Sequence, residues 1–188
     1  MARAMAWTEM STMLALCCAA CNGCQSSSHP TAPPGVTIGS LTVTSTAFAV
    51  NGPIPIDFTC DGADRSPPIT WSAAPPGTKS IAVLVDDPDA PGGTFVHWIA
   101  FNLPATLVSL PESTDAVSIG GVSGTNGFGR TGYAGPCPPR REVHRYNFRV
   151  LALDAPIDAR AGASRGAVDA AMNGHVLAEG VLVGVFEH

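Results

Sequence analysis

Short runs of β-branched and aromatic residues recur along the chain, and glycine- and proline-rich segments separate them. The clearest runs are 81–85, 94–101, 146–153 and 181–186. Runs of this length and composition, bounded by turn residues, are typical of β-strands. In the third run the apolar residues Phe148 and Val150 alternate with polar ones, which predicts a strand with one buried face.

The rest of the pattern supports a mainly β protein. Ile54, Ile56 and Phe58 also alternate, so we expect another half-buried strand there. One short helix is predicted over 167–172, because Ser164 can cap its start and Gly174 can end it. The content of 20 glycines and 17 prolines is high for a helical protein. Together these features indicate a β-dominated domain over residues 37–188.

The first 24 residues have the pattern of a targeting segment. An apolar stretch over 10–20 is too short to span a bilayer as a helix. It ends in Cys-Ala-Ala-Cys, and small residues before a cysteine resemble the processing site of bacterial lipoproteins, with Cys21 as the lipidated residue. An alternative is a metal site, since CAAC and CNGC both have Cys-x-x-Cys spacing. Residues 25–36 are rich in serine and proline and predict a flexible linker. We therefore expect a protein exported to the bacterial envelope, either lipidated or periplasmic.

Charge excludes one broad class of function. The net charge is −5 and only 13% of residues are charged, so the chain is not expected to bind nucleic acid, which requires a basic surplus. The basic residues are unevenly spread, however. Five of the ten fall close together: Arg130, Arg140, Arg141, Arg145 and Arg149. They form either a solvated loop or a local rim that attracts anions.

Candidate chemistry gathers where the 81–85 run ends. Two acids follow the run, and Pro88-Asp89-Ala90-Pro91-Gly92-Gly93 then forces a turn before the run that contains His97. Asp87, Asp89, His97 and His144 could perform acid–base chemistry, bind a metal, or bind a ligand without turnover. The simpler alternatives are that Asp87 caps backbone N–H groups and that His97 is a core histidine.

Common catalytic motifs are missing from the sequence. It contains no Gly-x-Ser-x-Gly, no phosphate loop with its lysine, and no His-Glu-x-x-His. We therefore expect a non-enzymatic protein that needs no cofactor.

Several motifs in a fixed order resemble the phosphatidylethanolamine-binding protein family, in particular its bacterial branch of Raf-kinase-inhibitor-like proteins. The motifs are DPDAP, VHW at His97, GPCPP, and HRY at 144–146, with CDG, SPP-x-x-W, GTKS, FGRTGY and GHVLAEG around them. The likeness covers about residues 38–188. It implies a large antiparallel sheet, a smaller sheet and one or a few short peripheral helices.

The same resemblance implies a shallow pocket for phosphate-like or phospholipid head-group anions. By motif, its residues would be Asp87, Asp89, His97, Gly135, Pro138, His144 and Tyr146. Within it, Asp87 would orient a histidine and would not itself touch the anion. Cys60 and Cys137 lie in loops near this inferred pocket, and in an exported protein a disulfide between them is expected.

Three functions follow as hypotheses. The first is binding of a small anion, such as phosphate or phosphorylethanolamine, by a protein with a possible membrane tether at its N-terminus. The second is a metal-assisted hydrolase that uses Asp87, Asp89, His97 and His144. The third is a protein-interaction module, such as a protease or signalling inhibitor, that uses the arginines between Arg130 and Arg149.

Overall fold

The computed structural model describes residues 37–188. The predicted targeting segment, the linker and the lipidation site at Cys21 lie outside the described residues. Within them, no helix is both long and apolar enough to cross a membrane.

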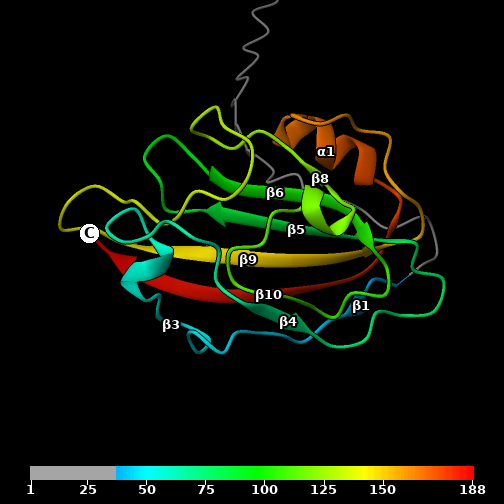
Figure 1. Ribbon diagram of the computed structural model, residues 1–188, viewed down its shortest axis with the longest axis horizontal. Coiled ribbons are helices and arrows are strands. Elements are labelled where there is room, and N and C mark those ends of the chain that lie inside the picture. Colours follow the sequence, from blue (N-terminus) through cyan, green and yellow to red (C-terminus); the bar gives the residue numbers. More distant parts are fainter. Residues whose placement is uncertain (1–36) are drawn as a thin grey trace, which may run out of the picture.

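Strands of one large sheet form the centre of the molecule (Figure 1). Its order is β1-β10-β9-β5-β6-β8, and β3 also pairs with β10. The strands of this sheet are β1 (Gly39–Ser40), β3 (Gly52–Pro53), β5 (Ser80–Asp87), β6 (Phe95–Pro104), β8 (Val122–Ser123), β9 (Val143–Leu153) and β10 (Val176–Glu187). The long strands β10, β9, β5 and β6 pair antiparallel. The short strands β1 and β3 run parallel to β10, so the sheet is mixed at this edge, while its long strands are antiparallel as expected.

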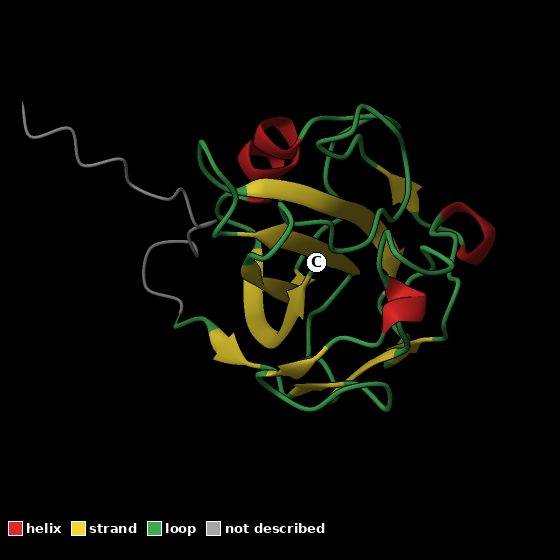
Figure 2. Cartoon of the chain, turned by 90° about the vertical axis from the view of Figure 1, so that its left-hand side faces the viewer, coloured by secondary structure: helices red, strands yellow, loops and turns green. Residues whose placement is uncertain are grey.

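A smaller antiparallel sheet packs on one face of the large one, and Figure 2 shows the two layers seen along the strands. It consists of β2 (Val43–Thr44), β4 (Ile69–Trp71) and β7 (Ser109–Leu110). One apolar core lies between the sheets, where Val83 and Val85 of β5 meet Ile69 and Trp71. Because side chains alternate along a strand, Ala82 and Leu84 of the same strand face the opposite side.

On that opposite side the helix α1 (Arg165–Met172) covers the large sheet. Its buried residues Val168 and Met172 pack with Leu84 in a second core. The helix begins as predicted, since the Ser164 hydroxyl accepts a hydrogen bond from the Ala167 amide. All eight residues of β5 are buried because the strand is covered on both faces.

One predicted strand is wrong. Residues Ile56–Phe58 form a 3₁₀ turn, η1, and Ile56 is exposed while Phe58 is buried. The extended Pro55 precedes the turn. Proline removes an amide donor at this point, so the chain leaves the sheet after β3. A second 3₁₀ turn, η2, covers Val117–Ile119.

Candidate functional site

The predicted residues come from three neighbouring strands at one end of the large sheet. Asp87 is the last residue of β5 and is paired with Phe95, the first residue of β6. On the other side of β5, Asp86 is paired with Asn147 of β9. His97 therefore lies near the start of β6, and His144 and Tyr146 lie near the start of β9. This end of the sheet is on the left in Figure 1.

A buried carboxylate–imidazole pair forms the centre of the site. Nδ1 of His144 donates to Oδ2 of Asp87 at 2.7 Å, and each side chain is only 4% exposed. The other carboxylate oxygen of Asp87 accepts the Asp89 amide at 2.9 Å. Both oxygens of Asp87 are thus occupied, and one of them fixes the orientation of His144, the role that the resemblance implied for Asp87.

The second nitrogen of His144 also faces a carboxylate. Nε2 lies 3.1 Å from Oε2 of Glu142, whose side chain is 51% exposed. Burial alone would lower the pKa of His144, but the hydrogen bonds to Asp87 and Glu142 outweigh it and raise the pKa above its usual value. Since both partners are acceptors when ionised, the arrangement favours the imidazolium form.

Tyr146 has a buried hydroxyl that is not used within the described part of the chain. Its Oη makes no hydrogen bond of good geometry within residues 37–188, although Asp87 and the Cys137 backbone lie close enough to influence its pKa. Burial, and then the negative charge of Asp87, raise the pKa of Tyr146 well above its usual value. The group therefore stays protonated and can donate. A buried unpaired hydroxyl indicates a position where a water or ligand completes the site.

The surroundings of His97 lower its pKa, whereas those of His144 raise it. Its Nδ1 donates to the carbonyl of Ala134 at 2.7 Å, and the Ala134 amide donates back to the His97 carbonyl. Burial lowers the pKa of His97, and the hydrogen bond to Ala134 only partly offsets this. The surroundings therefore favour the neutral ring, with Nδ1 protonated.

Aromatic rings surround His97. Tyr146 and Phe95 contact it edge-on, with centroids 5.2 and 5.1 Å away, and Phe128 lies at 5.9 Å. The loop that carries Phe128 is held by Asn126, whose Oδ1 accepts the amides of Phe128 and Arg130. Nearly half of Phe128 is exposed, so an aromatic edge of the site faces solvent.

Asp89 has a different role from the one expected. Its carboxylate binds Arg145 through Nε at 2.8 Å and Nη2 at 2.6 Å, and it also accepts the Arg145 amide. The hydrogen bond to Arg145 lowers the pKa of Asp89 to about 2. Asp89 thus ties the loop after β5 to β9, and its oxygens already have partners on Arg145.

Asp86, next to Asp87, turns to the other face of the sheet. It pairs with Arg165 at the start of α1, which also binds Asp169 at 2.9 Å. Adjacent residues of a strand point to opposite faces, so of the two acids only Asp87 enters the site.

Gly135 and Pro138 shape the loop that leads into β9. Gly135 was expected to line the pocket, but its amide donates to Oδ1 of Asp64 at 2.6 Å and is therefore already paired. A Cβ at this position would lie 2.5 Å from the Phe58 carbonyl oxygen, which leaves space for glycine only. The buried Pro138 uses its carbonyl to accept Nδ1 of His188 at 2.7 Å.

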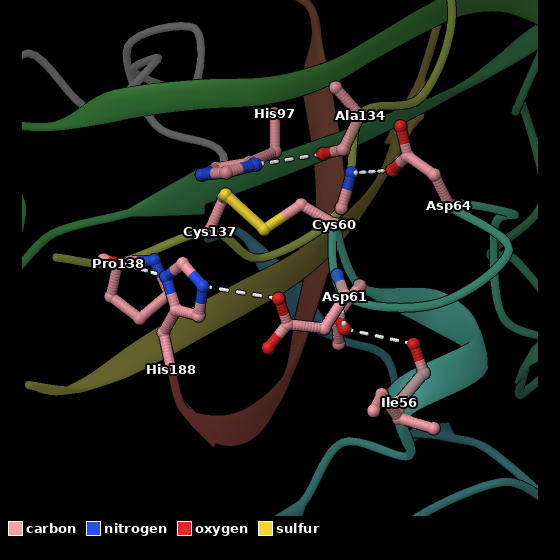
Figure 3. The surroundings of a disulfide bond; sticks show 11 residues. Ile56, Cys60, Asp61, Asp64, His97, Ala134, Cys137, Pro138 and His188 are labelled. Carbon is pink, nitrogen blue, oxygen red and sulfur yellow. Dashed lines mark hydrogen bonds and ion pairs between the residues drawn. A yellow bond between two sulfur atoms is a disulfide. The ribbon is translucent and has the colours of Figure 1, made fainter. Parts of the chain in front are cut away.

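Cys60 and Cys137 form the expected disulfide, which joins the η1 segment to this loop (Figure 3). The Cys60 amide also donates to the Pro136 carbonyl at 3.0 Å. The loop is therefore attached to the body of the domain both covalently and by backbone hydrogen bonds.

Three of the five arginines between Arg130 and Arg149 contact different partners in the structure. Arg145 binds Asp89, and Arg130 lies over the Phe128 ring at 5.7 Å. Arg149, on the same strand as Arg145, pairs with Glu179 of β10 at 2.7 Å. Three of the five arginines are therefore engaged with other side chains of the protein.

Sequence reasoning missed Glu142, Phe95 and Phe128. Glu142 had a usable signal, because residues two apart at a strand start share one face, and this places Glu142 beside His144. No such signal pointed to Phe128, which reaches His97 from a distant loop.

The fold and the site define a protein of two packed β-sheets with a histidine–carboxylate cluster at one end of the larger sheet. The family model of phosphatidylethanolamine-binding protein matches residues 44–187. The chain belongs to this family.

Relatives and solved structures agree with this assignment. The chain is 45% identical over 149 residues to the UPF0098 protein PH1269 of Pyrococcus horikoshii, covering 76% of this chain and 75% of that one. It is 44% identical over 151 residues to a UPF0098 protein of Aquifex aeolicus, covering 78% and 88%. The structure of YbcL from E. coli, described as a member of the mammalian PEBP family, superposes with a TM-score of 0.74 at 35% identity and covers 80% of this chain and 99% of that one. CT736 from Chlamydia trachomatis, described as a homologue in the same family, gives 0.74 at 36% identity with the same coverage.

Proposed function

We propose that this protein binds a small phosphate-like anion, free or as a lipid head group, at the cluster of His144, Tyr146 and His97, without chemical turnover. The observation that carries the proposal is the contact between His144 and Glu142. Asp87 favours the cationic form of the buried imidazole by raising the pKa of His144, and the outer nitrogen of the ring is met by a half-exposed carboxylate. An external anion can take the place of that carboxylate because the Glu142 side chain is half exposed and can turn into solvent, and an ion pair with such an exposed partner contributes about 1 kcal/mol.

Two further donors support an anion as the ligand. The Tyr146 hydroxyl stays protonated and unpaired among the described residues. His97 gains a second N–H when an anion raises its lowered pKa, so binding takes up a proton. Charge-assisted hydrogen bonds of this kind are about twice as strong as neutral ones.

The existing hydrogen bonds favour binding over metal-assisted hydrolysis. Both oxygens of Asp87 and both of Asp89 have partners, and so has each ring nitrogen of His144. A metal at this cluster would have to break several of these contacts first. A binding protein needs only Glu142 to move.

The test is calorimetric titration of the full chain with inorganic phosphate and phosphorylethanolamine. We expect one site in the wild type and at least a tenfold loss of affinity in His144→Asn, because a charged hydrogen bond contributes about 1.5–3 kcal/mol. His175→Asn, which removes the histidine just before β10 at the opposite end of the sheet from His144, is the control and should bind as the wild type does. Equal affinity in wild type and His144→Asn would reject the proposal.

A further inference from the structure

A second group of metal-ligating side chains surrounds the disulfide. The ligand atoms of Cys60, Cys137 and His188 all lie within 4.8 Å of one another. Nε2 of His188 is also 3.1 Å from Oδ1 of Asp61, the residue next to Cys60. Figure 3 shows His188 between Pro138 and Asp61, with the two sulfur atoms beside it. Two sulfurs, one imidazole and one carboxylate thus converge from three separate segments.

The chemistry of these donors selects a particular ion. Two thiolates, an imidazole and a carboxylate make a four-ligand set of the kind that holds Zn²⁺ tetrahedrally. Thiolate sulfur favours soft or borderline ions such as Zn²⁺ over Mg²⁺ or Ca²⁺. In the disulfide the sulfurs have no negative charge and bind metal poorly, so the set is complete only after reduction.

The histidine is already oriented as a metal ligand would be. Nδ1 donates to the carbonyl of Pro138 at 2.7 Å, which leaves Nε2 facing Asp61. Histidines that bind metals usually donate their other N–H to a carbonyl or carboxylate in this way. A cation at Nε2 would lie between the ring and the Asp61 carboxylate.

The segments that carry these donors are held together independently of the S–S bond. The Cys60 amide binds the Pro136 carbonyl at 3.0 Å, and the Arg141 amide binds the His188 carbonyl at 2.8 Å. Both cysteines are exposed, so a reductant can reach them. The donors therefore stay near one another when the disulfide opens.

We propose that reduction converts this disulfide into a Zn²⁺ site formed by Cys60, Cys137, His188 and Asp61. A dithiol reductant transfers two electrons and two protons, so that it becomes a disulfide and the two cysteines become thiols. Zn²⁺ then binds the two sulfurs as thiolates and releases their two protons to solvent. The disulfide and the metal are alternative links across the same sequence separation of 77 residues.

The experiment uses the full chain with Cys17, Cys18, Cys21 and Cys24 changed to serine, so that the N-terminal cysteines cannot contribute. Oxidised and reduced protein are each titrated with Co²⁺, a coloured substitute for Zn²⁺, and then with Zn²⁺ as competitor. We expect thiolate-to-cobalt absorption at one equivalent in the reduced protein alone. Zn²⁺ should also raise the melting temperature of the reduced protein, because a ligand of the native state stabilises it.

Variants identify the ligands. His188→Gln and Asp61→Asn should each weaken Zn²⁺ binding at least tenfold, and Cys60→Ser/Cys137→Ser should abolish the absorption. His175→Gln is the matched control, since it alters another histidine–aspartate pair, with Asp154 at 2.7 Å, and should have no effect. If the reduced chain unfolds, Zn²⁺ should restore its native circular dichroism. The proposal is overturned if the reduced protein shows no thiolate–cobalt absorption, if His188→Gln binds as the wild type does, or if Zn²⁺ fails to restore a reduced chain that has unfolded.

Discussion

Asp87 and His144 form a buried hydrogen-bonded pair, with Oδ2 and Nδ1 2.7 Å apart, between the last residue of β5 and the start of β9. The two residues are 57 positions apart in the sequence. The negative charge of Asp87 at the end of β5 therefore favours the protonated form of His144 at the start of β9.

Loss of the Asp87 charge should lower the pKa of His144. In Asp87→Asn we expect the unfolding free energy at pH 6 to fall by about 2 kcal/mol, because a hydrogen bond to a charged group contributes on this order. His144 avoids a larger penalty by losing its proton. Urea denaturation and an NMR pH titration of His144 measure the two effects. Asp158→Asn, at an exposed position, should change stability by less than about 0.5 kcal/mol. An unchanged His144 titration would contradict the assigned role of Asp87.

Removing the Glu142 carboxylate should strengthen anion binding. Phosphate has to displace this group from His144, so Glu142→Gln should bind phosphate about two- to fivefold more tightly. This gain in affinity corresponds to the loss of an ion pair that contributes up to about 1 kcal/mol. Calorimetry measures the change. Glu187→Gln removes the same charge at an exposed position paired with Val143 on β9, and it serves as the matched control. Equal gains in both variants would mean that only general charge matters.

The two histidines should give opposite pH dependence of stability. The pKa of His144 is raised, so its contribution is fully present below the unfolded value of 6.5 and is lost as the pH rises through the folded value. The pKa of His97 is lowered, so the folded state loses stability as the pH falls below 6.5. Urea unfolding at pH 5 and pH 8 distinguishes the contributions of the two histidines to stability.

The unfolding free energy of His144→Gln, relative to that of the wild type, should therefore be higher at pH 8 than at pH 5. For His97→Gln the same difference should be higher at pH 5 than at pH 8. Other titrating groups cancel in this comparison because they are common to all three proteins. The same sign of change in both variants would refute the opposite protonation states.

The loop at Gly135 should tolerate no side chain. A Cβ there would meet the Phe58 carbonyl at 2.5 Å and the Cα of Thr59 at 2.7 Å, so Gly135→Ala should cost about 2 kcal/mol of unfolding free energy through overpacking. Gly166→Ala is the control, because that position lies in α1 with nothing within 4 Å, and it should stabilise by about 0.5–1 kcal/mol. Thermal or urea unfolding of the two variants compares them directly.

Much of this architecture could be predicted from the sequence, because strands with alternating or continuous apolar residues leave a clear local signal. The long strands and the Ser164 cap were predictable in this way, whereas the orienting role of Asp87 came from the resemblance to a known family. Ile56 was not, because alternation over five residues cannot reveal that Pro55 turns the chain out of the sheet.

The partners of Asp89 and Gly135 could not be predicted from the sequence either. Arg145 and Asp64 lie 56 and 71 positions away from them, and nothing local records such contacts. The sequence shows which polar groups are present. The register of β5 against β9 determines which of these groups form hydrogen bonds with one another.

The most direct test of the central claim is an NMR titration of the full chain with inorganic phosphate, observing the imidazole nitrogens of His97 and His144. We predict saturable shifts of His144 Nε2 and His97 Nε2 with one midpoint, tighter at pH 5.5 than at pH 8, while His175 does not respond. If phosphate leaves both resonances unmoved, or moves them no more than His175, this cluster is not an anion-binding site.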